Sequence, residues 1–516
     1  MDVTGVPSYS VALLAPRDPA SGSGWQRILD QEGVPHHLAT SAADLPGSAL
    51  LLGEGELPEW AAEHIRAGGV GVLSGARALP DHEPGLAQRV RAVISGFTTP
   101  GGRWAAAPGP VTLLPRGTHP ARPGAGSFRV HEDRVPKYDS DPDVLPVLAT
   151  HGIGRGTLLY SPVALTELLM AEGDRLRRFS ELSLVTERVS AIDKADVADT
   201  LLALLRAGFR RAGLPLVRLG RYPGGAPSVL IVRVDVDGAF APRTQMLLDA
   251  TTAADLPASF FVNADLCRAH PGLPEEWPAA VEVGQHADVH TAFDTVDENL
   301  RNLRAGAAWV EERTGRTVRS FVAPRGLWNP ALGTALRTLG YPYSSDFGLD
   351  FDSLPFRDSS GLLQVPVHPY SPERARRWAD ETGEAPLGAA ETAAYYEAVA
   401  RRQIALGRPV HIYGHPEVLG QMAGVVVPAL AALARAAGLA VRTLGEYAAF
   451  WQRREQMRLA AAYDDATGVL ELKTAAGERD GVTIVVEPSA TTSKVVLDGT
   501  AYPVVPGREL VLEGTR

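Results

Sequence analysis

The chain has 516 residues, too many for one ordinary hydrophobic core, and roughly one domain per 100 to 200 residues predicts about three domains. Its composition, 45% hydrophobic and 21% charged, is typical of a folded globular protein and excludes a disordered chain. The net charge of -10 argues against a general affinity for phosphate backbones or anionic lipid surfaces, so we expect neither a nucleic-acid nor a membrane partner.

The cysteine content and the N-terminus bear on the cellular compartment. Cys267 is the only cysteine, so neither an internal disulfide nor a zinc-finger cluster can form. The first twenty residues lack a basic start followed by a long apolar run, and no uninterrupted apolar stretch of about 18 residues occurs. We therefore expect a cytoplasmic protein, although a chain trimmed of its signal peptide would look the same.

The first part of the chain alternates short apolar runs with helical patterns. The expected strands are 10–14, 49–52, 70–73 and 157–160, the expected helices are 25–32 and 59–67, and a loop-rich stretch covers 115–143. This alternation predicts an α/β domain with a doubly wound parallel sheet over residues 1–175.

The layout of this domain resembles the class I glutamine-amidotransferase-like domains. Catalysis in such a domain would require a nucleophilic cysteine on the turn after a central strand, and this sequence has Ser74 there. No His/Asp pattern supports Ser74 as a nucleophile, so an ordinary turn serine is the favoured interpretation. We expect a domain that scaffolds, docks or binds.

Three further parts follow in the chain. Residues 176–227 are expected to form a helical connector that ends at a Pro/Gly-rich turn, and residues 228–455 a catalytic domain. Residues 456–516 contain short strand-like runs, with Asp498 and Gly499 in a hairpin-turn position, and predict a small antiparallel β module. Oligomerisation through the N-terminal or the C-terminal domain is left open.

The central domain opens with an apolar strand that ends in two acidic residues. The run from Ser228 is apolar enough for burial on both faces, and Asp235 and Asp237 stand at its end, before Gly238. Carboxylates two residues apart on an extended strand point the same way, so both can reach one site. The alternative is a loop with solvated acids.

A pair of histidines follows a second buried strand, 257–262. His286 and His290 are four residues apart, which would place both on one face of a helical turn and let both imidazoles meet one metal ion. Two unrelated histidines are the alternative. Together with Asp237 they would form a three-ligand site with open positions for water and substrate.

The order of these motifs resembles the polysaccharide deacetylase family, carbohydrate esterase family 4, over residues 228–451. The matching positions are Asp235, Asp237 and Gly238 for the first motif, Gly284, His286 and His290 for the second, Ser259-Phe260-Phe261 for the family's Thr-Phe-Phe strand, and Ile412 to His415 for the fifth motif.

The resemblance implies a distorted barrel of about seven parallel strands with the active site at their C-terminal ends. It implies that Asp237, His286 and His290 hold a divalent metal, best Zn²⁺, with Co²⁺, Fe²⁺ or Mn²⁺ as alternatives. Asp235 would be the general base, and His415 the acid that protonates the leaving amine.

The implied reaction is removal of N-acetyl groups from a saccharide or glycoconjugate. Hydrolysis of another non-peptide C–N bond, in a ring amide or ureide, is the second hypothesis. An inactive carbohydrate-binding relative is the third.

The third motif departs from the family pattern. The family's Arg-x-Pro-aromatic pattern reads Val322-Ala323-Pro324-Arg325 here, so the arginine that orients the base is replaced by Val322. We expect the guanidinium of Arg325 to reach Asp235 instead and to count among the catalytic residues. The alternatives are a surface arginine or one that contacts an acidic substrate group.

Several other residues have weaker indications. The fourth motif is unclear in residues 345–350 and is left unassigned. Trp328, Tyr343 and Tyr413 are candidates for stacking on a sugar ring, although core packing is favoured for each. Asp288 is either a group that orients a metal ligand or a solvated acid. Structural roles are expected for His368 and His411.

Overall fold

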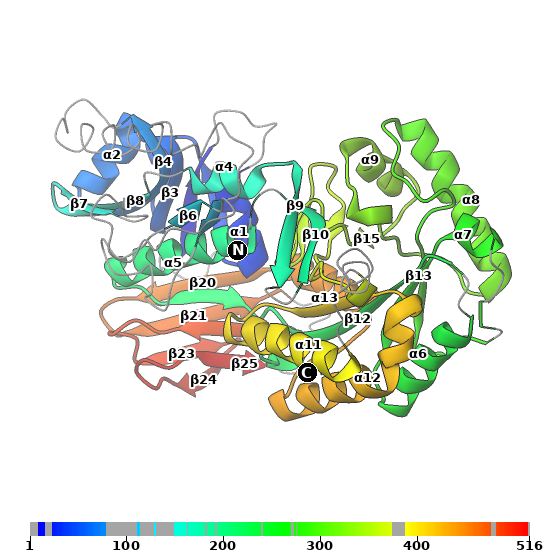
Figure 1. Cartoon of the computed structure of the whole chain (residues 1–516). Coiled ribbons are helices and arrows are strands. Elements are labelled where there is room, and N and C mark those ends of the chain that lie inside the picture. The colour runs from blue at the N-terminus through cyan, green and yellow to red at the C-terminus, as the bar shows by residue number, and fades with distance from the viewer. Residues whose placement is uncertain are drawn as a thin grey trace. The chain divides into compact units, whose positions relative to one another are not determined.

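The computed structural model describes residues 9–15, 23–78, 111–113, 128–130, 149–161, 164–180, 183–190, 192, 194–238, 241–269, 273–274, 276–373, 388–475 and 481–513 (Figure 1). Most of the expected loop region 115–143 lies outside these residues. The chain forms two compact units, each built from several segments. Unit 1 contains Met1–Ala171, Ala191–Gly220 and Arg453–Arg516, and unit 2 contains Glu172–Ser190 and Arg221–Gln452.

Unit 1 contains a six-stranded sheet in the order β2-β1-β3-β4-β8-β7. Its strands are β1 (Ser10–Leu14), β2 (His36–Ala39), β3 (Ser48–Glu56), β4 (Val70–Ala78), β7 (Ala149–Ile153) and β8 (Gly156–Ser161). Its helices are α1 (Gly24–Glu32), α2 (Glu59–Arg66), α4 (Leu165–Met170) and α5 (Lys194–Ala212). All strand pairs are parallel except β7 with β8, so the sheet is mixed. The strands and helices predicted within residues 1–175 are confirmed, and β2 and β7 were not predicted. The helical connector expected over 176–227 is wrong in its first part, where the antiparallel pair β9 (Asp174–Ser180) and β10 (Ser183–Ser190) precedes α5.

The C-terminal tail of unit 1 forms two further sheets. The strands are β11 (Leu216–Leu219), β20 (Leu459–Asp464), β21 (Val469–Thr474), β22 (Thr483–Glu487), β23 (Lys494–Leu497), β24 (Thr500–Pro503) and β25 (Leu510–Glu513). Asp498 and Gly499, both with positive φ, form the predicted hairpin turn between β23 and β24. The tail is not wholly antiparallel, however. β22 lies in the sheet with β11 and β25, so β21 and β23 are neighbours in the other sheet, where they run parallel.

Unit 2 is built around parallel strands in the order β14-β13-β12-β18, and β19 also pairs with β12. These strands are β12 (Val229–Val236), β13 (Ala258–Val262), β14 (Glu282–Gln285), β18 (Val410–Gly414) and β19 (Ala440–Val441). Every residue of β12 is buried, as expected for a strand covered on both faces. The predicted strands at 228–234 and 257–262 are confirmed.

Beyond β14 the parallel pairing becomes sparse. Single bridges join Gln285 to Phe321 and Phe321 to Ser344. The short strands β15 (Tyr343–Ser344), β17 (Leu363–Gln364) and β16 (Phe356–Arg357) follow, with β16 antiparallel to β17. Unit 2 therefore has an α/β fold, but the implied closed barrel is not found among the described residues, because these segments are too short to continue the ladder and the last pair is antiparallel.

Helices cover the strands of unit 2. They are α6 (Ala241–Ala253), α7 (Ala264–Ala269), α8 (Val296–Thr314), α9 (Pro330–Thr338), α11 (Ala389–Ala405), α12 (Pro416–Ala437) and α13 (Leu444–Gln456). Among the described helices, α12 alone is long and apolar enough to cross a membrane by length and composition. It packs against α6 and α11, and 56% of its most apolar window is buried, which is typical of a core helix.

Candidate metal and catalytic site

The register of the unit 2 strands brings the predicted site residues to one edge. Phe261 on β13 pairs with Asp235 on β12 and with Gly284 on β14. β18 runs parallel to the other side of β12. His286 directly follows β14 and His415 directly follows β18, so both emerge at the carboxyl edge with Asp235.

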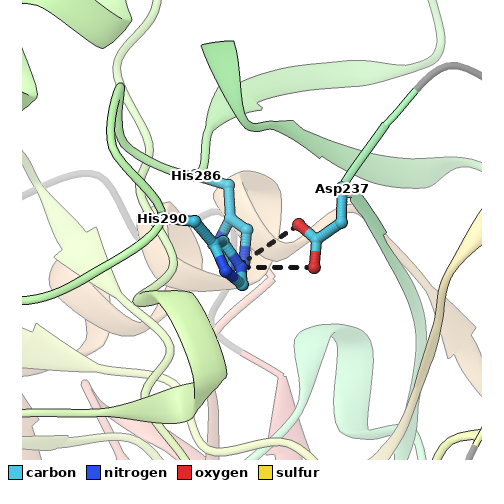
Figure 2. A group of neighbouring side chains, drawn as sticks. All are labelled: Asp237, His286 and His290. Carbon is cyan, nitrogen blue, oxygen red and sulfur yellow. Dashed lines mark hydrogen bonds and ion pairs between the residues drawn. The ribbon is translucent and has the colours of Figure 1, made fainter. Parts of the chain in front are cut away.

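Asp237, His286 and His290 form a compact group at this edge. One ligand atom from each residue lies within 4.8 Å of the others. The Nε2 atom of His286 is 3.4 Å from Oδ1 of Asp237, and Nε2 of His290 is 3.2 Å from Oδ2. Figure 2 shows both imidazoles facing the carboxylate. The structure thus brings the three expected ligands together.

The chemistry of this group fits a divalent metal. Nδ1 of His286 is 2.8 Å from the Val322 carbonyl, to which it can donate only as N–H, and this tautomer leaves a lone pair on Nε2 toward Asp237. Oδ1 of Asp237 is buried and has no hydrogen-bond partner. Two imidazole nitrogens and one carboxylate are a donor set that suits zinc and neighbouring transition metals.

The segment that carries the two histidines is not helical, so the helical turn expected there is wrong. Ala287 has a φ of 64°, in the left-handed region that breaks a helix. The amide of Asn263 donates to the His286 carbonyl (2.7 Å), and Oδ1 of Asn302 accepts from the N–H of Val289 (2.7 Å). These two asparagines, which the sequence analysis missed, hold the irregular loop in place.

Asp235 is held by an arginine on its own strand. Nε of Arg233 donates to Oδ1 of Asp235 at 2.7 Å, and an Nη donates to Oδ2 at 2.5 Å. The other Nη donates to the Ser345 carbonyl at 2.8 Å. The pair is buried, and the Arg233 side chain is 0% exposed. Two parallel donors on one carboxylate fix its position as well as its charge.

Arg325 does not take this place. Its side chain is exposed, and its φ of 58° lies in the left-handed region within the short turn Pro324–Gly326. Arg233 was overlooked although its position carried a signal. Arg233 and Asp235 are two residues apart, which places both side chains on one face of β12, and Asp237 follows at the same spacing just after the strand.

His415 is oriented by an acidic residue from a distant segment. Oε2 of Glu373 lies 3.2 Å from Nδ1 of His415, and Oε1 accepts the backbone N–H of His415 at 3.0 Å. Nε2 of His415 is 3.5 Å from Oδ2 of Asp237. Glu373 was also missed, because it lies 42 residues before His415 and belongs to no motif.

The charges around the base and the acid set their protonation states in opposite directions. Burial would raise the pKa of Asp235, but the charge of Arg233, followed by that of His286, lowers it below its ordinary value. Burial would lower the pKa of His415, but the charge of Glu373 raises it well above its ordinary value. The site therefore favours an ionised Asp235 beside a protonated His415.

The region of the unassigned fourth motif supports the loop of the third. Oδ1 of Asp346 accepts the N–H of Ala323 at 2.8 Å, and Oδ2 accepts the hydroxyl of Ser344 at 2.7 Å. Burial raises the pKa of Asp346 to about 6. Asp346 is thus a buried acid that fixes the loop following the bridge residue Phe321.

The aromatic candidates differ in their surroundings. Tyr343 is buried, and its hydroxyl donates to Glu282 at 2.6 Å. Tyr413 is buried against the guanidinium of Arg233, 5.3 Å from its ring centroid. Both are therefore enclosed in the protein. Trp328 is partly exposed, with its indole N–H 3.2 Å from Asp358.

The remaining polar candidates pair outside the metal group. Asp288 forms an ion pair with Arg268, and His411 contacts the Pro366 carbonyl through Nδ1. Nδ1 of His368 is 3.0 Å from Asp352.

Comparisons with known proteins give the following similarities. The model of the polysaccharide deacetylase family matches residues 217–344. No curated protein matches the chain.

Similar solved structures each cover less than half of the chain. A Mycobacterium smegmatis protein assigned to the polysaccharide deacetylases has 18% identity and a TM-score of 0.37, over 46% of this chain and 95% of that one. A family 4 carbohydrate esterase from Streptomyces lividans has 18% identity and a TM-score of 0.28, over 41% and 91%. A carbohydrate esterase family 4 pseudoenzyme from Bacillus anthracis has 15% identity and a TM-score of 0.30, over 44% and 68%.

Proposed function

We propose that unit 2 is a metal-dependent hydrolase that removes N-acetyl groups from a saccharide or glycoconjugate. The observation that carries this proposal is the convergence of Asp237, His286 and His290, with ligand atoms within 4.8 Å of one another, beside Asp235 and His415. The match of residues 217–344 to the polysaccharide deacetylase family supports the acetyl group as the one removed.

In this proposal Asp237, His286 and His290 hold the metal, which we expect to be zinc. A divalent metal bound there would polarise the acetyl carbonyl and lower the pKa of a nearby water. Asp235 would accept the proton of the attacking water, because its carboxylate stays ionised beside Arg233.

His415 would supply the proton for the leaving amine. An amine is a poor leaving group unless it is protonated, so amide hydrolysis needs an acid at this position. The negative charge of Glu373 keeps the imidazolium form favoured, and its carboxylate contacts both the ring and the backbone N–H of His415. A fixed acid and a fixed base near the proposed metal ligands match the two proton transfers of N-deacetylation.

The test is a metal analysis of the purified protein combined with an acetate-release screen over N-acetylated sugars, nucleotide sugars and oligosaccharides. We expect acetate release from at least one class, loss of release with a chelator, and recovery with zinc or cobalt. Asp235→Asn is the control for contaminating activity, because it should retain metal but release little acetate. Opening of a ring amide or ureide without acetate release from any member would refute the proposal.

For unit 1 we propose a scaffolding, docking or binding role, as expected if its sequence layout is that of a glutamine-amidotransferase-like domain without the nucleophilic cysteine. Ser74, at the position of a nucleophile, is 1% exposed, and its hydroxyl accepts the N–H of Thr166 at 3.2 Å. Its burial and its hydrogen bond support a structural rather than a catalytic role for Ser74.

A further inference from the structure

Each of the three guanidinium nitrogens of Arg233 has a fixed partner. Two of its nitrogens donate to the two oxygens of Asp235 at 2.7 and 2.5 Å, and the third donates to the Ser345 carbonyl at 2.8 Å. The Arg233 side chain is 0% exposed, so it cannot touch a substrate that enters from solvent. Arg233 therefore does not act by contact with the substrate, and Asp235 is the site carboxylate that it holds directly.

Three aromatic rings surround the guanidinium and limit its movement. Its Cζ atom lies 6.0 Å from the ring centroid of Phe261, 5.8 Å from that of Phe347 and 5.3 Å from that of Tyr413. A planar guanidinium between aromatic faces has little rotational freedom, and its two parallel donors dictate the plane of the carboxylate they hold.

Stability alone is a weak reason for such a pair. Removing two charges from water costs several kcal/mol, and well-packed apolar residues often replace a buried ion pair without loss of stability. A carboxylate also offers about four acceptor positions. Arg233 occupies two of them, so Asp235 can still accept a proton while its orientation is fixed.

We propose that Arg233 is the positioning residue of the catalytic base, and that it supplies from the base's own strand the orienting charge that the apolar Val322 cannot. The inference rests on the proposed deacetylase function, because it treats Asp235 as the base. Arg233 and Asp235 then place the orienting cation and the base in alternate positions on one face of β12, and the metal ligand Asp237 directly follows the strand.

The first test is a kinetic double-mutant cycle with Arg233→Met and Asp235→Asn, measured as acetate release per bound metal. Arg233→Met should lower kcat by about 10²-fold with a KM within about threefold, because a misoriented base loses most of its contribution. In the Asp235→Asn background the same change should have almost no further effect, since residues that act as a unit are not additive. An equal loss in both backgrounds would overturn the proposal.

The second test uses thermal unfolding and needs no activity. Each single variant leaves one buried group of the pair without its charged partner, whereas the double variant removes both charges. We expect the double variant to unfold at a temperature at least about 5 °C higher than either single variant. A double variant whose loss in unfolding temperature equals the sum of the two single losses would show that Arg233 and Asp235 are not coupled, and would also overturn the proposal.

Two further variants complete the design. Arg454→Met is the matched control, because Arg454 is likewise 0% exposed but belongs to unit 1, where Nε donates to the Gly220 carbonyl at 2.8 Å. It should lower the unfolding temperature and leave kcat per bound metal unchanged. If Arg233→Met does not yield folded protein, Arg233→Lys takes its place in the kinetic cycle, because it keeps the charge but not the two parallel donors.

The two tests also separate this proposal from the proposed function. If the wild-type protein releases no acetate from any substrate class, the deacetylase function fails. The thermal cycle then decides alone whether Arg233 positions Asp235. If acetate is released but both cycles are additive, the function stands and the role of Arg233 falls.

Discussion

Glu373 is joined to His415 at two points, through the ring and through the backbone. Its Oε2 lies 3.2 Å from Nδ1 of the imidazole, and its Oε1 accepts the His415 N–H at 3.0 Å and the N–H of Leu419 at 3.4 Å. Because α12 begins at Pro416, Glu373 also caps the start of that helix. The same carboxylate thus anchors the helix and aims the proposed acid.

We predict that Glu373→Gln lowers kcat for acetate release by about 10²-fold, because a neutral amide no longer favours the imidazolium form. The amide oxygen can still accept the two backbone N–H groups, so the fold and the bound metal should be retained. Steady-state kinetics with metal analysis checks this. A variant that loses its metal, or that shows normal kcat, would separate Glu373 from the acid.

The metal ligands and the base should respond differently to substitution. His290→Ala should remove most of the bound metal, because it deletes one of only three protein ligands. Asp235→Asn should retain the metal, while kcat falls by about 10² to 10⁴-fold because an amide cannot accept the proton. Elemental analysis beside kinetics tests both. If Asp235→Asn lost its metal and Asp237→Asn kept it, the two roles would be reversed.

Local patterns predicted the elements that carry the site. The strand at 229–236 begins with four apolar residues and is acidic near its end, and that pattern indicates a buried strand with carboxylates at its carboxyl edge. The spacing of His286 and His290 likewise indicated a shared partner. The strand register explains why these segments meet, since residues that follow parallel neighbours emerge together.

Features that depend on tertiary contacts were not predicted. The four-residue spacing of the histidines suits a helix, but Ala287 adopts a left-handed conformation because Asn263 and Asn302 bind the loop backbone. Nothing near Glu373 in sequence indicates its pairing with His415. No residue type next to Arg233 in the sequence identifies what a buried arginine in an apolar strand would contact. Its spacing of two from Asp235, and of two more to Asp237, was the one indication that it shares their face.

Asn302 gives a test of the irregular histidine loop. Its Oδ1 accepts the N–H of Val289 at 2.7 Å, and its amide donates to the Val289 carbonyl at 3.1 Å, directly before the ligand His290. Asn302→Ala should weaken metal affinity about tenfold, because groups that orient a metal ligand contribute to its preorganisation. Chelator competition measures the change. Gln245→Ala on α6 is the control, because its amide donates only to the exposed Asp249 nearby, and it should leave the metal affinity unchanged.

Asp346 makes the stability of the protein depend on pH in a predictable direction. Burial raises its pKa in the folded protein to about 6, against roughly 3.9 in an unfolded chain, so the folded state binds more protons between these values. The free energy of unfolding should therefore fall as pH rises from about 4 to 6, by roughly 3 kcal/mol from this group, with the full loss present above pH 6.

Asp346→Asn keeps an oxygen for the Ala323 N–H and does not titrate, so this part of the pH dependence should disappear. The measurement is denaturant unfolding of both proteins at pH 4, 5, 6 and 7, with the variant gaining on the wild type as pH rises. A constant difference across the range would show that Asp346 is ionised in the folded protein throughout, and that the contacts from Ala323 and Ser344 outweigh its burial.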